Sequence, residues 1–362
     1  PESIDKSAQA DQIIFESEDN SIVNSSVNSE LVFQLSNKED KAIICLGNSE
    51  DYIESICSIW NKLWGNIRYK FTFKIGFNSE KVTSDDTIVI SPLNLKHEWI
   101  GFPIVELDGR KVLQSEVELW LEGNSELSEP LMAFWDQVNH GESTFSDLKL
   151  AESSLELIDK TDGNKVRKFA RNLAYLSPNK NEAKLIKSKA LSNLSIHISK
   201  SDSKGILRLR NFNVESYKGG SEVLTQSLID RLKKIVVEPT LEVRVIYEAF
   251  LEKHDGWWHR AIRLAVKEIF MILDNGLSKL FWRLIHEEVQ IIDELVPIVL
   301  KTPLNEEELL REAPRKTKTD TIELILPHLV RVKWFSLHAF LLTKIYSSQK
   351  VIEKHLLIDK EV

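Results

Sequence analysis

The stretch from residue 51 to residue 77 constrains the fold most, because its periodicity changes from helical to strand-like across one glycine, Gly65. Before this glycine, apolar residues recur every three or four positions, which predicts one apolar helix face: Ile53, Ile56, Cys57, Trp60, Leu63 and Trp64. After it the period becomes two, which predicts a half-buried strand with an apolar side: Ile67, Tyr69, Phe71, Phe73, Ile75 and Phe77. This stretch therefore indicates how the chain folds, and no catalytic motif is attached to it.

Composition narrows the class of protein. The chain has 362 residues, of which 28% are charged and 42% hydrophobic, as in an ordinary globular protein. No apolar run approaches the roughly 20 residues that a membrane helix needs, and the N-terminus lacks the pattern of a secretory signal. Cys45 and Cys57 both lie in apolar patterns typical of core thiols in a reducing compartment, with a bond between them as the alternative. We expect a cytoplasmic protein with no membrane partner.

The periodicities predict an α+β chain of three domains: a mixed α/β N-terminal domain (1–125), a mainly helical basic middle domain (126–237) and an all-helical C-terminal domain (238–362). In the first domain, short β-branched or aromatic runs predict strands at 13–15, 30–35, 42–46, 87–90 and 103–107, besides the strand after Gly65. In the middle domain, two short strands are expected at 194–198 and 206–209.

The net charge of −8 is unevenly distributed. Acidic residues strongly outnumber basic ones in residues 1–150, whereas basic residues are in excess in 151–362, and most of that excess lies in 160–234. Such a region binds a polyanion or contacts acidic residues of its own chain. The second interpretation includes masking of the basic surface by the acidic N-terminal domain.

The motifs of several enzyme classes are missing. The chain has no phosphate-binding loop of the form G-x-x-x-x-G-K-[ST] or G-x-G-x-x-G, and no G-x-S-x-G nucleophile elbow. His286 and Glu287 begin like a zinc-protease motif, but Gln290 stands where that motif needs its second histidine. We therefore predict a non-enzymatic protein without catalytic residues, metal or cofactor. Two weaker hypotheses are a metal site at His254 and His259, and a nuclease site built from a set of charged residues: Asp85, Asp86, Glu106, Asp108 and Lys111.

Three groups of residues are candidates for binding a partner. The polar side of the strand after Gly65 offers Arg68, Lys70 and Lys74, and the basic middle region offers Lys165, Arg167, Lys168 and Arg171. Trp257 and Trp258 form the third group, with core packing as the alternative interpretation. Aromatic residues are sparse in the basic region, and this favours a solvated helix face or a contact with the acidic N-terminal domain over binding of nucleic acid.

Residues 60–77 resemble the N-terminal domain of the GTPase-associated proteins of bacterial ternary conflict systems. In that family an apolar helix leads into an Arg-x-x-Phe-[Ser/Thr]-Phe strand, and this chain has Arg68, Phe71, Thr72 and Phe73 in that pattern, followed by Gly76 and Phe77. The resemblance covers under a tenth of the chain. It implies a non-enzymatic adaptor of antiviral or related defence, with a GTPase or a protease-like effector as its partner.

The first hypothesis is accordingly an adaptor or regulatory protein of a bacterial multi-protein system, which binds a protein through helical and basic surfaces. The alternative is a nucleic-acid-associated protein or an unrecognised nuclease, whose binding would fall steeply with salt. A third hypothesis, an enzyme with a small-molecule cleft between domains, has no residues to support it in the sequence.

Overall fold

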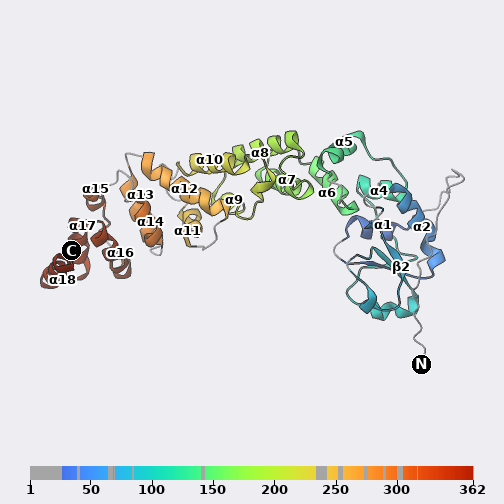
Figure 1. Cartoon of the computed structure of the whole chain (residues 1–362), viewed down its shortest axis with the longest axis horizontal. Coiled ribbons are helices and arrows are strands. Elements are labelled where there is room, and N and C mark those ends of the chain that lie inside the picture. Colours follow the sequence, from blue (N-terminus) through green and yellow to red (C-terminus); the bar gives the residue numbers. More distant parts are fainter. Residues whose placement is uncertain are drawn as a thin grey trace, which may run out of the picture. The chain divides into compact units, whose positions relative to one another are not determined.

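The computed structural model describes residues 27–38, 41–63, 68, 70–83, 85–139, 143–233, 243–251, 256–272, 276–287, 291–299, 305–315 and 317–361. The chain divides into two compact units, Pro1–Glu126 and Leu127–Val362. We call them the sheet unit and the helical unit (Figure 1). A small sheet in the first and helices throughout the described part of the second confirm the α+β class. The further division of the helical part at residue 237 stays a prediction, since residues 234–242 lie outside the described residues.

The sheet has four parallel strands in the order β2-β3-β1-β4: β1 (Ile43–Leu46), β2 (Phe73–Ile75), β3 (Ile88–Ser91) and β4 (Ile104–Glu106). β1 and β3 are continuous buried runs, as the central strands of a parallel sheet covered on both faces should be. The strands predicted at 42–46, 87–90 and 103–107 are confirmed. Because all four strands are parallel, their carboxyl ends lie at one edge of the sheet.

Helices α1 (Ser29–Ser36), α2 (Ser49–Lys62) and α4 (Glu116–Glu122) belong to the sheet unit, as do the 3₁₀ helices η1 (Ser79–Lys81) and η2 (Leu93–Trp99). Helix α1 packs against β1, β4 and α4. Trp99 of η2 packs in a cluster with alternate residues of β1 and with Val89 of β3. Its indole nitrogen donates to Ser91 Oγ at 2.8 Å. The predicted helix after residue 51 is confirmed as α2.

Helix α1 corrects the strand expected at 30–35. The Asn28 side chain accepts from Leu31 N at 3.0 Å and so caps the helix start. Leu31, Val32 and Leu35 then bury one helical face. A short apolar run fits either period, and here the capping residue decides the outcome. The strand expected at 13–15 lies outside the described residues.

Strand β2 corrects the second part of the opening pattern. It is three residues long and, among the described strands, stands at the edge of the sheet and pairs with β3 alone. Phe71 is buried and meets Trp60 edge to face at 5.9 Å, but the residues of its apolar row that follow are largely exposed: Phe73 50%, Ile75 59% and Phe77 61%. Ile67 and Tyr69 lie outside the described residues. Alternation in the sequence does not show whether another element covers an edge strand, so the apolar side expected to be buried is open at Phe73 and Ile75.

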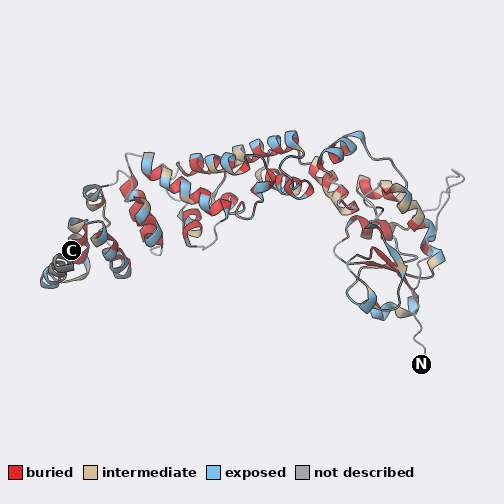
Figure 2. Cartoon of the chain, in the orientation of Figure 1, coloured by how far each residue is buried: buried red, intermediate tan, exposed pale blue. Residues whose placement is uncertain are grey.

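The described helices of the helical unit are α5 (Glu129–Val138), α6 (Phe145–Leu155), α7 (Gly163–Leu176), α8 (Lys184–Ile198), α9 (Ser203–Leu207), η3 (Val214–Ser216), α10 (Gly220–Leu232), α11 (Val243–Leu251), α12 (Trp257–Ile272), α13 (Leu277–Glu287), α14 (Ile292–Val299), α15 (Glu306–Arg311), α16 (Thr319–Arg331), α17 (Phe335–Ile345) and α18 (Ser348–Glu361). Extensive packing joins helices close together in the chain, such as α7 with α8, α8 with α10 and α10 with α12. Their buried residues lie on the faces turned toward neighbouring helices (Figure 2). Within the described part of the chain, none of the helices has both the length and the apolar character needed to cross a membrane.

The two strands expected at 194–198 and 206–209 are also corrected, because these residues belong to the end of α8 and to α9 with the turn after it. Leu191, Leu194 and Ile198 are buried at helical spacing. Asp202 caps α9, since its Oδ1 accepts from Gly205 N at 2.8 Å. The short apolar runs are thus two helical faces that are separated by a capped turn.

Candidate functional site

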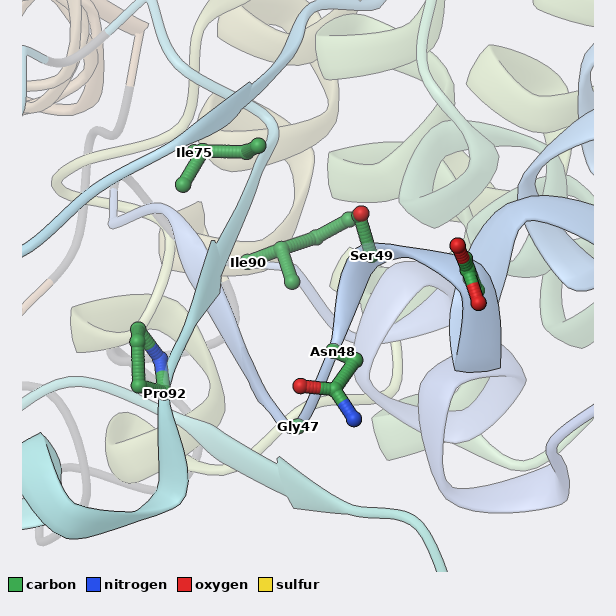
Figure 3. A pocket seen from close by; sticks show the side chains of 7 residues that line it. Gly47, Asn48, Ser49, Ile75, Ile90 and Pro92 are labelled. Atoms are coloured by element: carbon green, nitrogen blue, oxygen red, sulfur yellow. The ribbon is translucent and has the colours of Figure 1, made fainter.

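A pocket of about 340 Å³ lies at the carboxyl edge of the sheet. It is lined by the start of α2 and the ends of two neighbouring strands: Gly47, Asn48, Ser49, Glu50, Ile75, Ile90 and Pro92. Figure 3 shows Asn48 and Ser49 on the loop and helix that follow β1, with Ile75 and Ile90 beside them. This edge is where open parallel sheets commonly bind ligands.

The polar groups around this pocket serve the turn into α2. Asn48 N donates to Asp51 Oδ2 at 2.9 Å, and the Tyr52 hydroxyl donates to the carbonyl oxygens of Leu46, at 3.0 Å, and Val105, at 3.3 Å. A Cβ on Gly47 would lie 3.1 Å from Asp51 Oδ2 and 3.2 Å from the Tyr52 ring, so the turn is tight. The described lining residues include one carboxylate, Glu50, but no basic side chain to work with it, so they offer no acid–base pair.

The carboxylates of the nuclease hypothesis lie at opposite ends of the parallel strands. Asp86 precedes β3 and accepts from Lys74 Nζ at 2.5 Å and from Thr83 N at 2.8 Å. Burial alone would raise the pKa of Asp86, but these hydrogen bonds hold it below its ordinary value. Glu106 ends β4 and pairs with Lys96 at 2.5 Å.

The strand register gives the separation of these acids. Ser91 and Glu106 both lie opposite Leu46, so they stand at the same level of the sheet. Asp86 precedes Ser91 by five residues, and at about 3.3 Å per residue it lies about 16 Å from the level of Glu106 along the strands. The described residues contain no group of three or more His, Cys, Asp or Glu side chains that could hold a metal ion. His254 lies outside the described residues, and His259 is buried. The structure therefore keeps Asp86 and Glu106 of the nuclease hypothesis apart, and the histidine hypothesis stays untested because His254 lies outside the described residues.

The basic residues of the strand region contribute unequally to the surface. Arg68 and Lys70 are exposed, and Arg68 donates to the carbonyl of Asn61 at 3.3 Å. Lys74 is already paired with Asp86. Of these three candidates, Arg68 and Lys70 therefore lie at the surface just before β2, whereas Lys74 is held in an ion pair.

Trp257 and Trp258 do not lie on a contact surface. Their exposed fractions are 8% and 0%. The Trp257 indole donates to the carbonyl of Phe212 at 2.8 Å, and the Trp258 indole donates to the carbonyl of Ile206 at 3.1 Å. Both tryptophans therefore join α12 to the segment around α9 through buried hydrogen bonds. This agrees with the alternative interpretation of core packing, and we leave both residues out of the proposed contact surface.

Three arginines come together where α7, α8 and α9 meet. Arg167 and Arg208 both donate to Asn164 Oδ1, Arg208 at 2.8 Å, and Arg171 Nη2 donates to the carbonyl of Arg208 at 2.6 Å. Arg167 Nη1 also lies 2.9 Å from His197 Nε2 of α8. Arg167 is buried, whereas Arg171 and Arg208 are exposed. We call Arg167, Arg171 and Arg208 the arginine cluster.

The arginine cluster is not neutralised by a carboxylate. Among the described residues, no salt bridge involves any of its three guanidinium groups. The nearby acids are used as helix caps: Asp162 Oδ1 accepts from two backbone nitrogens of α7, and Asp202 caps α9. Burial, together with the charges of the other two arginines, lowers the pKa of Arg167. Burial and the charge of Arg167 likewise lower the pKa of His197.

This arrangement gathers like charges, which costs folding free energy unless an anion is bound. Lys165 and Lys168, exposed on α7, extend the positive surface. Sequence reasoning found Arg167 and Arg171 through their spacing on a basic helix but did not include Arg208, Asn164 or His197 among the site residues. Arg208 is 37 positions from Arg171, so only the packing of α9 against this region shows that it belongs to the cluster.

Comparison of the chain with models of protein families, with curated proteins and with solved structures finds no match. The resemblance of residues 60–77 to the GTPase-associated proteins therefore stays a prediction from sequence.

Proposed function

We propose that this chain is a non-enzymatic adaptor or regulator that binds an acidic surface of a protein partner through the arginine cluster. The observation that carries the proposal is the gathering of Arg167, Arg171 and Arg208 without a carboxylate among the described residues. A guanidinium is always charged and forms paired hydrogen bonds with a carboxylate, so a clustered set favours a partner rich in Asp and Glu. Lys165 and Lys168 would add long-range attraction.

An acidic protein is favoured over nucleic acid because the aromatic side chains of this region are not available for stacking. Phe169, Phe212 and Tyr217 are 2%, 3% and 3% exposed. Proteins that hold single strands without sequence preference combine a basic groove with exposed aromatic rings, and in the described part of this region Tyr175 is the one ring that is largely exposed. Nucleic acid remains the second candidate because guanidinium groups also bind phosphates.

The proposed layout has a sheet-containing N-terminal part, a basic helical middle that binds the partner and a helical C-terminal part. The role in bacterial defence, beside a GTPase or a protease-like effector, is part of the same proposal. It is supported by the resemblance of residues 60–77 and by the lack of a catalytic constellation in the sheet pocket.

A pull-down from the native host tests the proposal. The bait is the full chain, as wild type, as the double variant Arg171→Glu/Arg208→Glu, and as Lys267→Glu, which makes the same kind of charge reversal at an exposed position of α12. We expect a protein partner that survives nuclease treatment, is lost from the double variant and is kept by Lys267→Glu. The partner should then bind the purified wild-type chain, with affinity that falls as salt increases.

Two outcomes would count against this function. Material that disappears on nuclease treatment would move the assignment to nucleic acid. A partner that binds the double variant as well as the wild type would show that the arginine cluster is not the contact surface. Both exchanged arginines are exposed, so the variants are expected to fold, and circular dichroism checks this.

A further inference from the structure

A second cationic feature of the helical unit is a cavity of about 330 Å³ at the beginning of α8, separate from the arginine cluster. Lys180, Lys184, Lys187 and Lys218 line it, together with Ser188 and three residues that offer apolar surface: Leu185, Leu191 and Tyr217. None of the described residues that line it is acidic. The volume lies at the lower end of the range for small-molecule sites.

Lys187 is the buried cation of this cavity. It is 3% exposed, and its Nζ donates to the carbonyl of Asn179 at 2.7 Å. The ammonium group has three donors, and among the described residues this carbonyl is the one acceptor recorded for it. Burial lowers the pKa of Lys187 to about 8, an effect that the charge of Glu182 partly offsets. A buried ammonium without a carboxylate partner is costly, which points to an anionic ligand.

The apolar part of the lining has its own role. The Tyr217 hydroxyl donates to the carbonyl of Ala170 at 2.6 Å, and the residue is 3% exposed, so its ring adds only a small apolar part of the cavity wall and offers no open face for stacking. Leu191 is 7% exposed, whereas Leu185 is 84% exposed and belongs to the rim. The site thus combines lysines with an aromatic ring and two leucines, as an anion joined to an organic group requires.

We infer that this cavity binds a phosphate monoester, with the phosphate held by Lys187 and the rim lysines and the organic group against Leu185, Leu191 and Tyr217. A phosphate monoester carries more charge than a carboxylate and has three strong acceptor oxygens, so it can engage several ammonium groups at once. Lysine is an established point-charge ligand of phosphate. This inference does not depend on the arginine cluster or on the proposed partner.

Isothermal titration calorimetry of the full chain at pH 7 tests the inference with phenyl phosphate, inorganic phosphate and benzoate as probes. Phenyl phosphate is expected to bind about tenfold tighter than either of the others, because it alone supplies both the dianion and the ring. Lys187→Met should weaken its binding about tenfold or more, since one charge-assisted hydrogen bond is lost. Lys189→Met, which changes an exposed lysine paired with Asp159 outside the cavity, should bind as the wild type does.

Leu185→Glu provides a second test that does not alter the core. This exposed rim position would place a carboxylate among the lysines, and binding of phenyl phosphate should weaken about tenfold. No binding of phenyl phosphate at millimolar concentration, or wild-type affinity in both Lys187→Met and Leu185→Glu, would overturn the inference. Equal affinity for phenyl phosphate and inorganic phosphate would overturn the assignment of the organic group.

Discussion

In the sheet unit, Lys74 and Lys96 are paired with carboxylates, whereas the arginine cluster of the helical unit has no such partner among the described residues. Lys74 pairs with Asp86, and Lys96 pairs with Glu106. In the helical unit, the acids nearest the cluster cap helices, and Lys187 has a backbone carbonyl as its recorded acceptor. Because the sheet unit comes from the more acidic part of the chain, its acids can neutralise its bases. The helical unit also has ion pairs, such as Lys189 with Asp159, but the arginine cluster and Lys187 keep positive charge for a ligand.

Apolar groups show the reverse contrast. The edge strand β2 exposes Phe73 and Ile75, and Phe77 just after it is also exposed, while the helical unit buries Trp257 and Trp258. Exposed apolar side chains beside an edge strand are a common site of protein contact. The two units therefore present different chemistry to a partner: the sheet unit an apolar row, and the helical unit a positive surface.

The largest effect is expected where the contrast in aromatic burial is greatest. Trp258→Ala removes a fully buried indole and its hydrogen bond to Ile206, so we expect the free energy of unfolding to fall by about 3 to 5 kcal/mol. Phe77→Ala, at a 61% exposed position, should change it by less than about 0.5 kcal/mol. Urea unfolding followed by tryptophan fluorescence and circular dichroism measures both. Similar losses of unfolding free energy in Trp258→Ala and Phe77→Ala would contradict the difference in aromatic burial between the two units.

A smaller effect of opposite sign is expected at Lys187. Its pKa of about 8 lies below the ordinary value of 10.5, so keeping the ammonium buried costs up to about 3 kcal/mol at pH 7. Lys187→Met removes that cost and also the hydrogen bond to Asn179, and we expect the chain to become more stable by about 2 kcal/mol. Stability would then increase while phosphate binding decreases, as is typical of a binding residue.

The pH dependence of this gain has a defined sign. Below pH 8 the folded and unfolded chains both carry the proton on Lys187, and the cost is present in full. Between pH 8 and 10.5 the folded chain loses the proton first, so the wild type gains stability as pH rises. The difference between Lys187→Met and the wild type should therefore be largest at pH 7 and shrink toward pH 10, as measured by urea unfolding. A constant difference would show that the side chain is solvated.

Sequence patterns predicted the parts of the fold that depend on a local period. The helix after residue 51 and the strands β1, β3 and β4 are long enough, or apolar enough, for the period to decide. Helix α1 was mistaken for a strand because its apolar run is short and its start depends on the Asn28 cap. The alternation around β2 predicts a half-buried strand, but alternation does not show whether a strand stands at the edge of the sheet. β2 does stand there, and its apolar residues Phe73 and Ile75 are exposed.

The candidate site was predictable only where its residues share one helix. Arg167 and Arg171 are one turn apart on α7, and their positive charge is visible in the sequence. Arg208 joins them through the packing of a helix that the sequence indicated as a strand. Lys187 looked like any other lysine of the basic region, because burial of a single side chain follows from tertiary packing. The exposure of tryptophans is undetermined in the sequence for the same reason.

The smallest effect concerns the exposed ion pair of the sheet unit. The Lys96 and Glu106 side chains are 56% and 49% exposed, so Lys96→Ala should change the free energy of unfolding by less than about 0.5 kcal/mol. Lys74→Ala should cost about 1 kcal/mol or more, because Asp86 is 13% exposed and loses a charged donor. Urea unfolding of both variants measures the difference. Equal losses of unfolding free energy would mean that the exposed pair Lys96–Glu106 stabilises the sheet unit as much as the partly buried pair Lys74–Asp86 does. If only Lys74→Ala is destabilising, then only the partly buried pair is structural, and the difference in charge pairing between the two units rests on that pair.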